Sequence, residues 1–81
     1  MIQIALKFAG YFRKFLKEEK EYVKVSLENS STVRDILMNF DIDFQKIKVK
    51  PIIIVNGDVY SLDYVIKDRD EVILINMMSG G

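Results

Sequence analysis

Two segments in the first third of the chain alternate between apolar and polar side chains. In residues 2–8, and again in residues 22–28, every second residue is aliphatic or aromatic. A period of two predicts β-strands with one buried face. Gly10 ends the first strand, and aromatic residues at helix-like spacing within 11–20 predict one to two turns of helix. We therefore expect an antiparallel hairpin whose two strands are joined by this helical segment.

The clearest helical pattern lies in residues 33–40. Its apolar residues share one face of a helix, at Val33, Ile36, Leu37 and Phe40. Thr32, three residues before Asp35, is a helix-start signal. The helix should end within residues 39–41 and cover one face of the sheet, and residues 41–50 show no regular period.

A β-branched run at 52–55 predicts a third strand. It is followed by Asn56-Gly57, a strong signal for a tight turn. After that turn, Val59-Tyr60 can pair back as a short strand. The middle of the chain thus predicts a second hairpin.

The segment 62–70 is rich in turn-forming residues, and we expect Val65 and Ile66 to point inward. The last strand is predicted over residues 71–77. The element order is then strand, short helix, strand, helix and three strands, which indicates an α+β fold.

The third and last strands carry apolar residues on both faces, at 52–55 and 72–75. A single helix covers only one face of a small sheet, so the opposite face should expose an apolar patch, a usual mark of a partner surface. The candidate partner-surface residues are Ile53, Ile54, Ile73, Ile75 and Met77. Alternatively, the 41–50 segment covers this face, and Met77 simply completes the last strand. The deciding observation is the exposure of whichever of Ile53 and Ile54 points away from the helix.

The amino-acid composition limits the kinds of catalytic and binding site that the chain could form. The 81 residues predict one domain over 1–75 and a tail over 76–81, without cysteine or histidine. A thiol nucleophile, a Ser-His-Asp triad, a neutral imidazole base and a zinc site of the usual kind are therefore excluded. Because 12 basic and 12 acidic residues cancel, no nucleic-acid footprint is evident. The absence of a signal peptide pattern and of a long apolar run predicts a cytoplasmic protein without a membrane partner.

The chain ends in Ser79-Gly80-Gly81. Two residues without a Cβ can thread a channel too narrow for other side chains. The α-carboxylate of Gly81 would then be a substrate for another enzyme, with Met78, Ser79 and Gly80 as the threading segment. The competing interpretation is a frayed end or a cloning remnant, since glycine is common at disordered termini.

Short motifs spread along the whole chain resemble the ThiS/MoaD family of ubiquitin-like sulfur carriers. They are Phe8-Ala9 before an Arg13-containing segment, Thr32-Val33-Arg34-Asp35-Ile36-Leu37, Val55-Asn56-Gly57, Asp68-Arg69-Asp70-Glu71-Val72 and the terminal diglycine. The resemblance implies a ubiquitin-like β-grasp fold. This is a mixed sheet of four to five strands on one main helix, with a flexible C-terminal Gly-Gly tail. The length is more similar to MoaD, the molybdopterin synthase small subunit, than to ThiS.

The resemblance also implies a reaction performed by partner enzymes. A ubiquitin-activating-like adenylating enzyme of the ThiF type would use ATP and Mg²⁺ to convert the Gly81 carboxylate to an acyl-adenylate. A sulfur donor would then displace AMP and leave a thiocarboxylate. The large subunit of molybdopterin synthase, or thiazole synthase, would accept the sulfur. No cofactor would be bound by the chain itself, which would be a carrier and not an enzyme.

Two departures from the family pattern bear on this reading. Arg69 stands where the family usually has glycine, and Asn76-Met77-Met78-Ser79 replaces the usual proline-containing segment. Three alternatives to the molybdopterin carrier remain. They are a ThiS-like carrier for thiamine synthesis, a ubiquitin-like modifier joined to lysines through Gly81, and a plain β-grasp interaction module.

Overall fold

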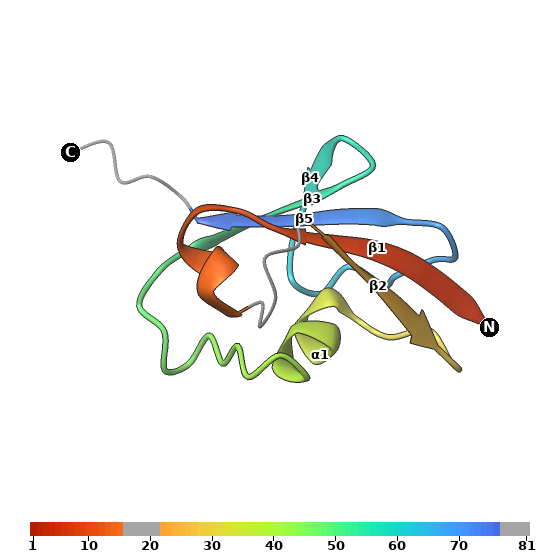
Figure 1. Ribbon diagram of the computed structural model, residues 1–81, viewed down its shortest axis with the longest axis horizontal. Helices are drawn as coiled ribbons and strands as arrows, with labels where there is room; N and C mark the ends of the chain where they lie inside the picture. The colour runs from red at the N-terminus through yellow and green to blue at the C-terminus, as the bar shows by residue number, and fades with distance from the viewer. Residues whose placement is uncertain (16–21, 77–81) are drawn as a thin grey trace.

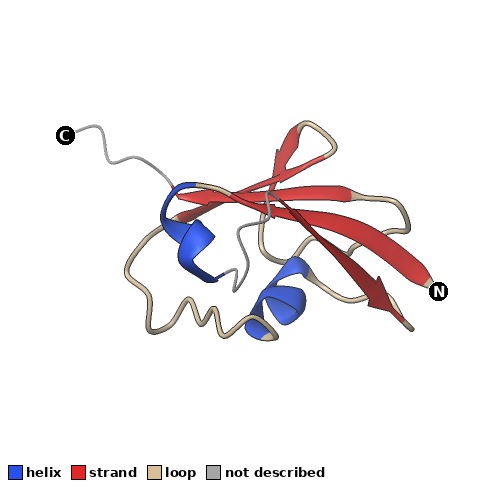
Figure 2. Cartoon of the chain, viewed as in Figure 1, coloured by secondary structure: helices blue, strands red, loops and turns tan. Residues whose placement is uncertain are grey.

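A computed structural model describes residues 1–15 and 22–76. In these ranges one five-stranded sheet has the strand order β2-β1-β5-β3-β4. The strands are β1 (Ile2–Phe8), β2 (Tyr22–Leu27), β3 (Pro51–Val55), β4 (Asp58–Tyr60) and β5 (Glu71–Asn76). Helix α1 (Val33–Met38) lies on one side of the sheet, and a 3₁₀ helix, η1 (Gly10–Phe15), lies at one end (Figures 1 and 2). The expected α+β class and element order are confirmed.

The strand pairing explains why the sheet is mixed. β1 pairs antiparallel with β2, and β3 pairs antiparallel with both β4 and β5. At the centre, β1 and β5 run parallel, from the pair Ala5↔Glu71 to the pair Phe8↔Leu74. Both predicted hairpins are confirmed. β5 lies between the two hairpins and joins them into one sheet through its parallel pairing with β1 and its antiparallel pairing with β3.

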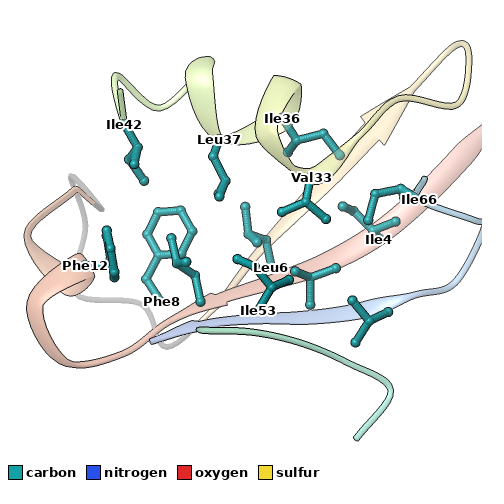
Figure 3. Packing of buried hydrophobic residues seen from close by; sticks show 13 residues of the cluster. Ile4, Leu6, Phe8, Phe12, Val33, Ile36, Leu37, Ile42, Ile53 and Ile66 are labelled. Atoms are coloured by element: carbon teal, nitrogen blue, oxygen red, sulfur yellow. The ribbon is translucent and has the colours of Figure 1, made fainter. Parts of the chain in front are cut away.

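The core lies between α1 and the inner face of the sheet (Figure 3). Leu37 of α1 is 0% exposed, and it packs with Val33 and Ile36 over inward side chains of three strands. Those strand residues are Ile4, Leu6, Phe8, Ile53, Val55, Val72 and Leu74. Each such side chain contributes about 1.5–3 kcal/mol on burial. In β1 the buried half of the strand is the one that the alternation in the sequence predicts.

Helix α1 starts at its sequence signal and ends at Met38, just before the predicted end within residues 39–41. Thr32 Oγ1 accepts a hydrogen bond from the Asp35 amide at 3.3 Å, as the capping pattern predicts. Beyond Met38, the Asp41 amide donates to the Met38 carbonyl at 3.1 Å and the Ile42 amide donates to the Leu37 carbonyl at 3.3 Å. With φ of 63° at Asp41, this is a Schellman motif. It turns the chain so that Ile42 is buried beside Leu37.

A buried carboxylate organises the segment before β5. Asp70 is 5% exposed and accepts hydrogen bonds from the Lys67 amide at 2.8 Å, the Tyr64 hydroxyl at 3.0 Å and Asn56 Nδ2 at 2.9 Å. Burial, reinforced by this negative partner, raises the pKa of Tyr64. Asn56 also accepts from the Glu71 amide at 3.0 Å. The 56–57 turn is therefore tied to the start of β5.

Val65 and Ile66, which we expected to point inward, differ in burial. Ile66 is 1% exposed, as predicted, whereas Val65 is 52% exposed and the prediction for it was wrong. Val65 forms an isolated antiparallel bridge with Thr32, and the Ile66 amide donates to the Ser31 carbonyl at 2.9 Å. The backbone is therefore extended here, and successive side chains point to opposite sides.

Arg69 adopts a left-handed backbone conformation, with φ of 70°. Its amide donates to the Gln3 carbonyl at 2.7 Å, and the neighbouring Asp68 Oδ1 accepts from the Gln3 amide at 2.8 Å. This two-bond link to β1 requires a positive φ at position 69, where the family usually has glycine. An arginine at that position is strained, because a Cβ disfavours the left-handed region.

Replacing Arg69 by glycine should therefore stabilise the protein. Removing the strain outweighs the added flexibility of the unfolded chain, and we expect a gain of about 0.5–1 kcal/mol in unfolding free energy. Urea denaturation measures it. R69A is the control: it keeps the Cβ, so its stability should stay near that of the unsubstituted chain. Equal stability of R69G and R69A would contradict the strain argument.

Replacing Asp70 by asparagine should destabilise the protein without changing the size of the side chain. The new side-chain NH₂ group would face the three groups that donate hydrogen bonds to Asp70. Each hydrogen bond to a charged group contributes about 1.5–3 kcal/mol to stability. D58N is the matched control, since Asp58 is exposed on β4 and should tolerate the change within about 0.5 kcal/mol. If both variants unfold at the same urea concentration, the Asp70 network does not stabilise the fold.

Candidate functional site

The face of the sheet opposite α1, called here the outer face, carries one continuous cross-strand row. The register places neighbouring side chains of all five strands in this order: Tyr22, Lys7, Ile73, Ile54 and Val59. Directly opposed residues on one face of a sheet are close enough to contact each other. Next to this row, Ile75 pairs with Ile52.

The aliphatic part of this face forms a patch on the side of the sheet away from α1. We define the outer patch as Ile52, Ile54, Val59, Ile73 and Ile75. Val59 is 71% exposed, and the four isoleucines are partly exposed. Of the two residues that decide the question, Ile54 points away from α1 and is partly exposed, while Ile53 is buried. The described residues do not bury this face, and its role as a partner surface stays a prediction.

Two expectations about this face need correction. Ile53 is 2% exposed within the core, so it does not belong to the partner-surface set. The alternative that residues 41–50 cover the face is also wrong, because this segment lies on the α1 side (Figure 1). Ile42 is 0% exposed in the core, and Phe44, Ile47 and Val49 pack against it. Val59, which sequence reasoning missed, becomes part of the face through its pairing with Ile54.

Polar and charged residues border the outer patch along its edge near β1 and β2. Lys7 pairs with both Ile73 and Tyr22, and in the next row Ala5 pairs with Lys24 and Glu71. The border carries both signs of charge. Exposed apolar residues with such a border are typical of a protein-binding surface.

The outer patch reaches the end of the last strand. Ile75 precedes Asn76, the last residue of β5, and Asn76 Oδ1 accepts a hydrogen bond from the Tyr11 amide at 2.9 Å. The last strand, predicted over residues 71–77, is observed as far as Asn76, the last described residue. No local signal predicts this contact, because its partners lie 65 positions apart. The predicted site residues Met77, Met78, Ser79, Gly80 and Gly81 lie outside the described residues.

The outer patch is an aliphatic surface of the kind that can contact a protein partner. The chain contains neither cysteine nor histidine. In residues 1–15 and 22–76, no cluster of three or more acidic side chains could hold a metal ion. No helix in the same ranges is long and apolar enough to cross a membrane. What the geometry can do is bind a partner at the outer patch and present the chain that follows Asn76.

Known structures share this fold. SAMP1 from Haloferax volcanii superposes with a TM-score of 0.71 at 19% identity, covering 98% of this chain and 99% of the other. A putative molybdopterin converting factor subunit 1 from Pyrococcus furiosus gives a TM-score of 0.71 at 20% identity, covering 96% and 100%. The HVO 2177 protein of Haloferax volcanii gives 0.75 at 18% identity, covering 99% and 87%. At these identities the likeness establishes the fold, the ubiquitin-like β-grasp.

Sequence comparison gives a family as well as a fold. No curated protein matches the chain significantly. The model of the ThiS family, in contrast, matches residues 7–81, which include β1 from Lys7 onward, every later element and the diglycine. The chain belongs to the ThiS family of ubiquitin-like sulfur carriers.

Proposed function

We propose that this protein carries sulfur as a thiocarboxylate on Gly81, as the small subunit of a molybdopterin synthase. The observation that supports this most directly is the continuity of the outer patch with the end of β5, in a ThiS-family chain that continues to Ser79-Gly80-Gly81. Proteins of this family generally act as carriers and not as catalysts. They interact with adenylating enzymes and with enzymes that accept sulfur.

The proposed chemistry takes place at the carboxylate of Gly81 in the partners' active sites. An oxygen of that carboxylate attacks the α-phosphorus of Mg²⁺-bound ATP, pyrophosphate leaves, and an acyl-adenylate forms. A sulfide-equivalent donor then attacks the acyl carbon, and AMP leaves with the C–O bond pair. Adenylation is needed because a carboxylate is a poor electrophile. Without cysteine in the chain, its carried sulfur has to reside on the terminal carbonyl carbon.

The energetics explain why a tail needs a folded body. Ordering the five residues 77–81 in a partner's channel costs roughly 5–10 kcal/mol of backbone entropy. Burying Met77 and Met78 there would return roughly 1.5–3 kcal/mol each. Docking of the outer patch supplies further binding energy and holds the tail at the channel entrance. Affinity thus comes from the body and reactivity from the tail.

A second candidate function is protein modification through Gly81. One structural neighbour is named a small archaeal modifier protein, and attachment of Gly81 to lysines would use the same adenylation step. The product distinguishes the two: an oxygen-to-sulfur mass change for a carrier, or an amide linkage of Gly81 to lysine for a modifier. A ThiS-like carrier for thiamine synthesis would yield the same thiocarboxylate but pass it to thiazole synthase.

Deleting Gly81 should abolish activation and leave the folded body intact. We expect the full chain, incubated with its adenylating enzyme, Mg²⁺-ATP and a sulfur donor, to gain the oxygen-to-sulfur mass change on its C-terminal peptide. The deletion variant should remain unmodified, with a melting temperature near that of the full chain because no described core contact is lost. Tandem mass spectrometry and thermal denaturation measure the two effects. An unmodified full chain under these conditions would contradict the carrier proposal.

Substitutions in the outer patch should weaken docking without slowing the chemical step. We expect I54S and I73S to raise the KM for adenylation about ten- to a hundredfold at unchanged kcat, since burial of each side chain is worth about 1.5–3 kcal/mol. V65S is the matched control: Val65 is 52% exposed but outside the outer patch. Steady-state pyrophosphate release measures these constants. A KM that rises equally in V65S would argue against a specific docking face.

A further inference from the structure

The end of β5 is held against the start of η1 by two successive hydrogen bonds. The Ala9 amide donates to the Leu74 carbonyl at 2.9 Å. Two residues further along both segments, the Tyr11 amide donates to Asn76 Oδ1 at 2.9 Å. β1 itself ends at Phe8. The Asn76 side chain thus extends the contact between the two segments beyond the end of the parallel ladder.

Gly10 leaves the space that this contact requires. A Cβ at position 10 would lie 2.1 Å from Asn76 Oδ1 and 3.3 Å from Asn76 Cγ. The residue also has φ of +61°, which side chains rarely adopt. Position 10 therefore excludes a side chain for two reasons, backbone conformation and the close approach of Asn76.

The partner of Asn76 is itself anchored in the core. Tyr11 packs edge-on against Phe12, with ring centroids 5.3 Å apart, and Phe12 is 0% exposed. The ring centroids of Phe12 and Phe44 are in turn 5.9 Å apart. Asn76 is consequently bonded to a segment that cannot shift without disturbing buried aromatic packing.

We propose that Asn76 is a positioning residue that fixes where residues 77–81 leave the folded body relative to the outer patch. The proposal rests on the proposed function, because it assigns Asn76 a role in activation of Gly81. Five residues span at most roughly 17 Å when fully extended, so the partner's reaction centre lies within that distance of Asn76. The reacting atoms must come within about 3–3.5 Å of each other. If the point at which the tail leaves the folded body could move, the Gly81 carboxylate would sample a larger volume. Its effective concentration at the partner's reaction centre would then be lower.

This role predicts a different kinetic effect from that of the outer patch. N76A removes the acceptor for the Tyr11 amide, and G10A forces the Asn76 side chain away. We expect either change to lower kcat for adenylation about tenfold, with KM within twofold of the unsubstituted chain. N76D keeps an oxygen in the same place and should retain most of the activity.

Two further measurements separate positioning from simple loss of stability. D70N is the stability control, since Asp70 precedes β5 at its opposite end and its substitution should leave kcat unchanged. Amide hydrogen exchange at Tyr11 should be faster in N76A than in the unsubstituted chain and slow again in N76D. All chains are assayed at full length, at a temperature at which each is folded.

The outcomes are distinguishable. An N76A chain activated as fast as the unsubstituted one would overturn the positioning role and leave the proposed function standing. Equal losses of kcat in N76A and D70N would overturn it too, because they would reflect stability alone. An unsubstituted chain that is not activated at all would overturn both the proposed function and the role of Asn76 in it, even if hydrogen exchange confirmed the contact.

Discussion

The parallel pairing of β1 with β5 is the interaction on which the rest of the structure depends. Together with the pairing of β3 and β5, it joins the two hairpins into one sheet, and it brings the end of β5 beside η1. It also sets the register in which Ile73 lies between Lys7 and Ile54, and so makes the cross-strand row of the outer face continuous. A slip of one residue would exchange the buried and exposed halves of β5. Core and candidate site thus depend on the same register.

The short chain places a second constraint on the molecule. The described ranges contain one α-helix, which has six residues and covers only part of the inner face of the sheet. Ile42 and Phe44, from the segment without regular secondary structure after α1, cover more of that face. The Schellman motif at Asp41 makes this possible, because it turns Ile42 back under the helix. All of this material lies on one face. Among residues 1–15 and 22–76, the outer patch is therefore left uncovered by α1 and by the 42–44 segment.

One strand, β5, contributes to the core, to the outer patch and to the contact with η1. β5 contributes Val72 and Leu74 to the core, Ile73 and Ile75 to the outer patch, and Asn76 to the contact with η1. The continuous apolar run 72–75 in the sequence serves both faces of the sheet. In the proposed carrier, the same strand transmits the docked position of the body to the start of the tail.

The sequence by itself determined the elements, the ends of α1, the 56–57 turn and the diglycine, because these depend on spacing and on local backbone chemistry. The family motifs predicted the β-grasp fold, whereas the positive φ of Arg69 became known only from the structure. What only the tertiary structure decided depends on contacts between distant residues. Period-two logic alone could not tell which of Ile53 and Ile54 faces α1, because both faces of β3 are apolar; pairing with β5 determines it. The bond between Asn76 and Tyr11 likewise exists only because the sheet brings together segments 65 positions apart.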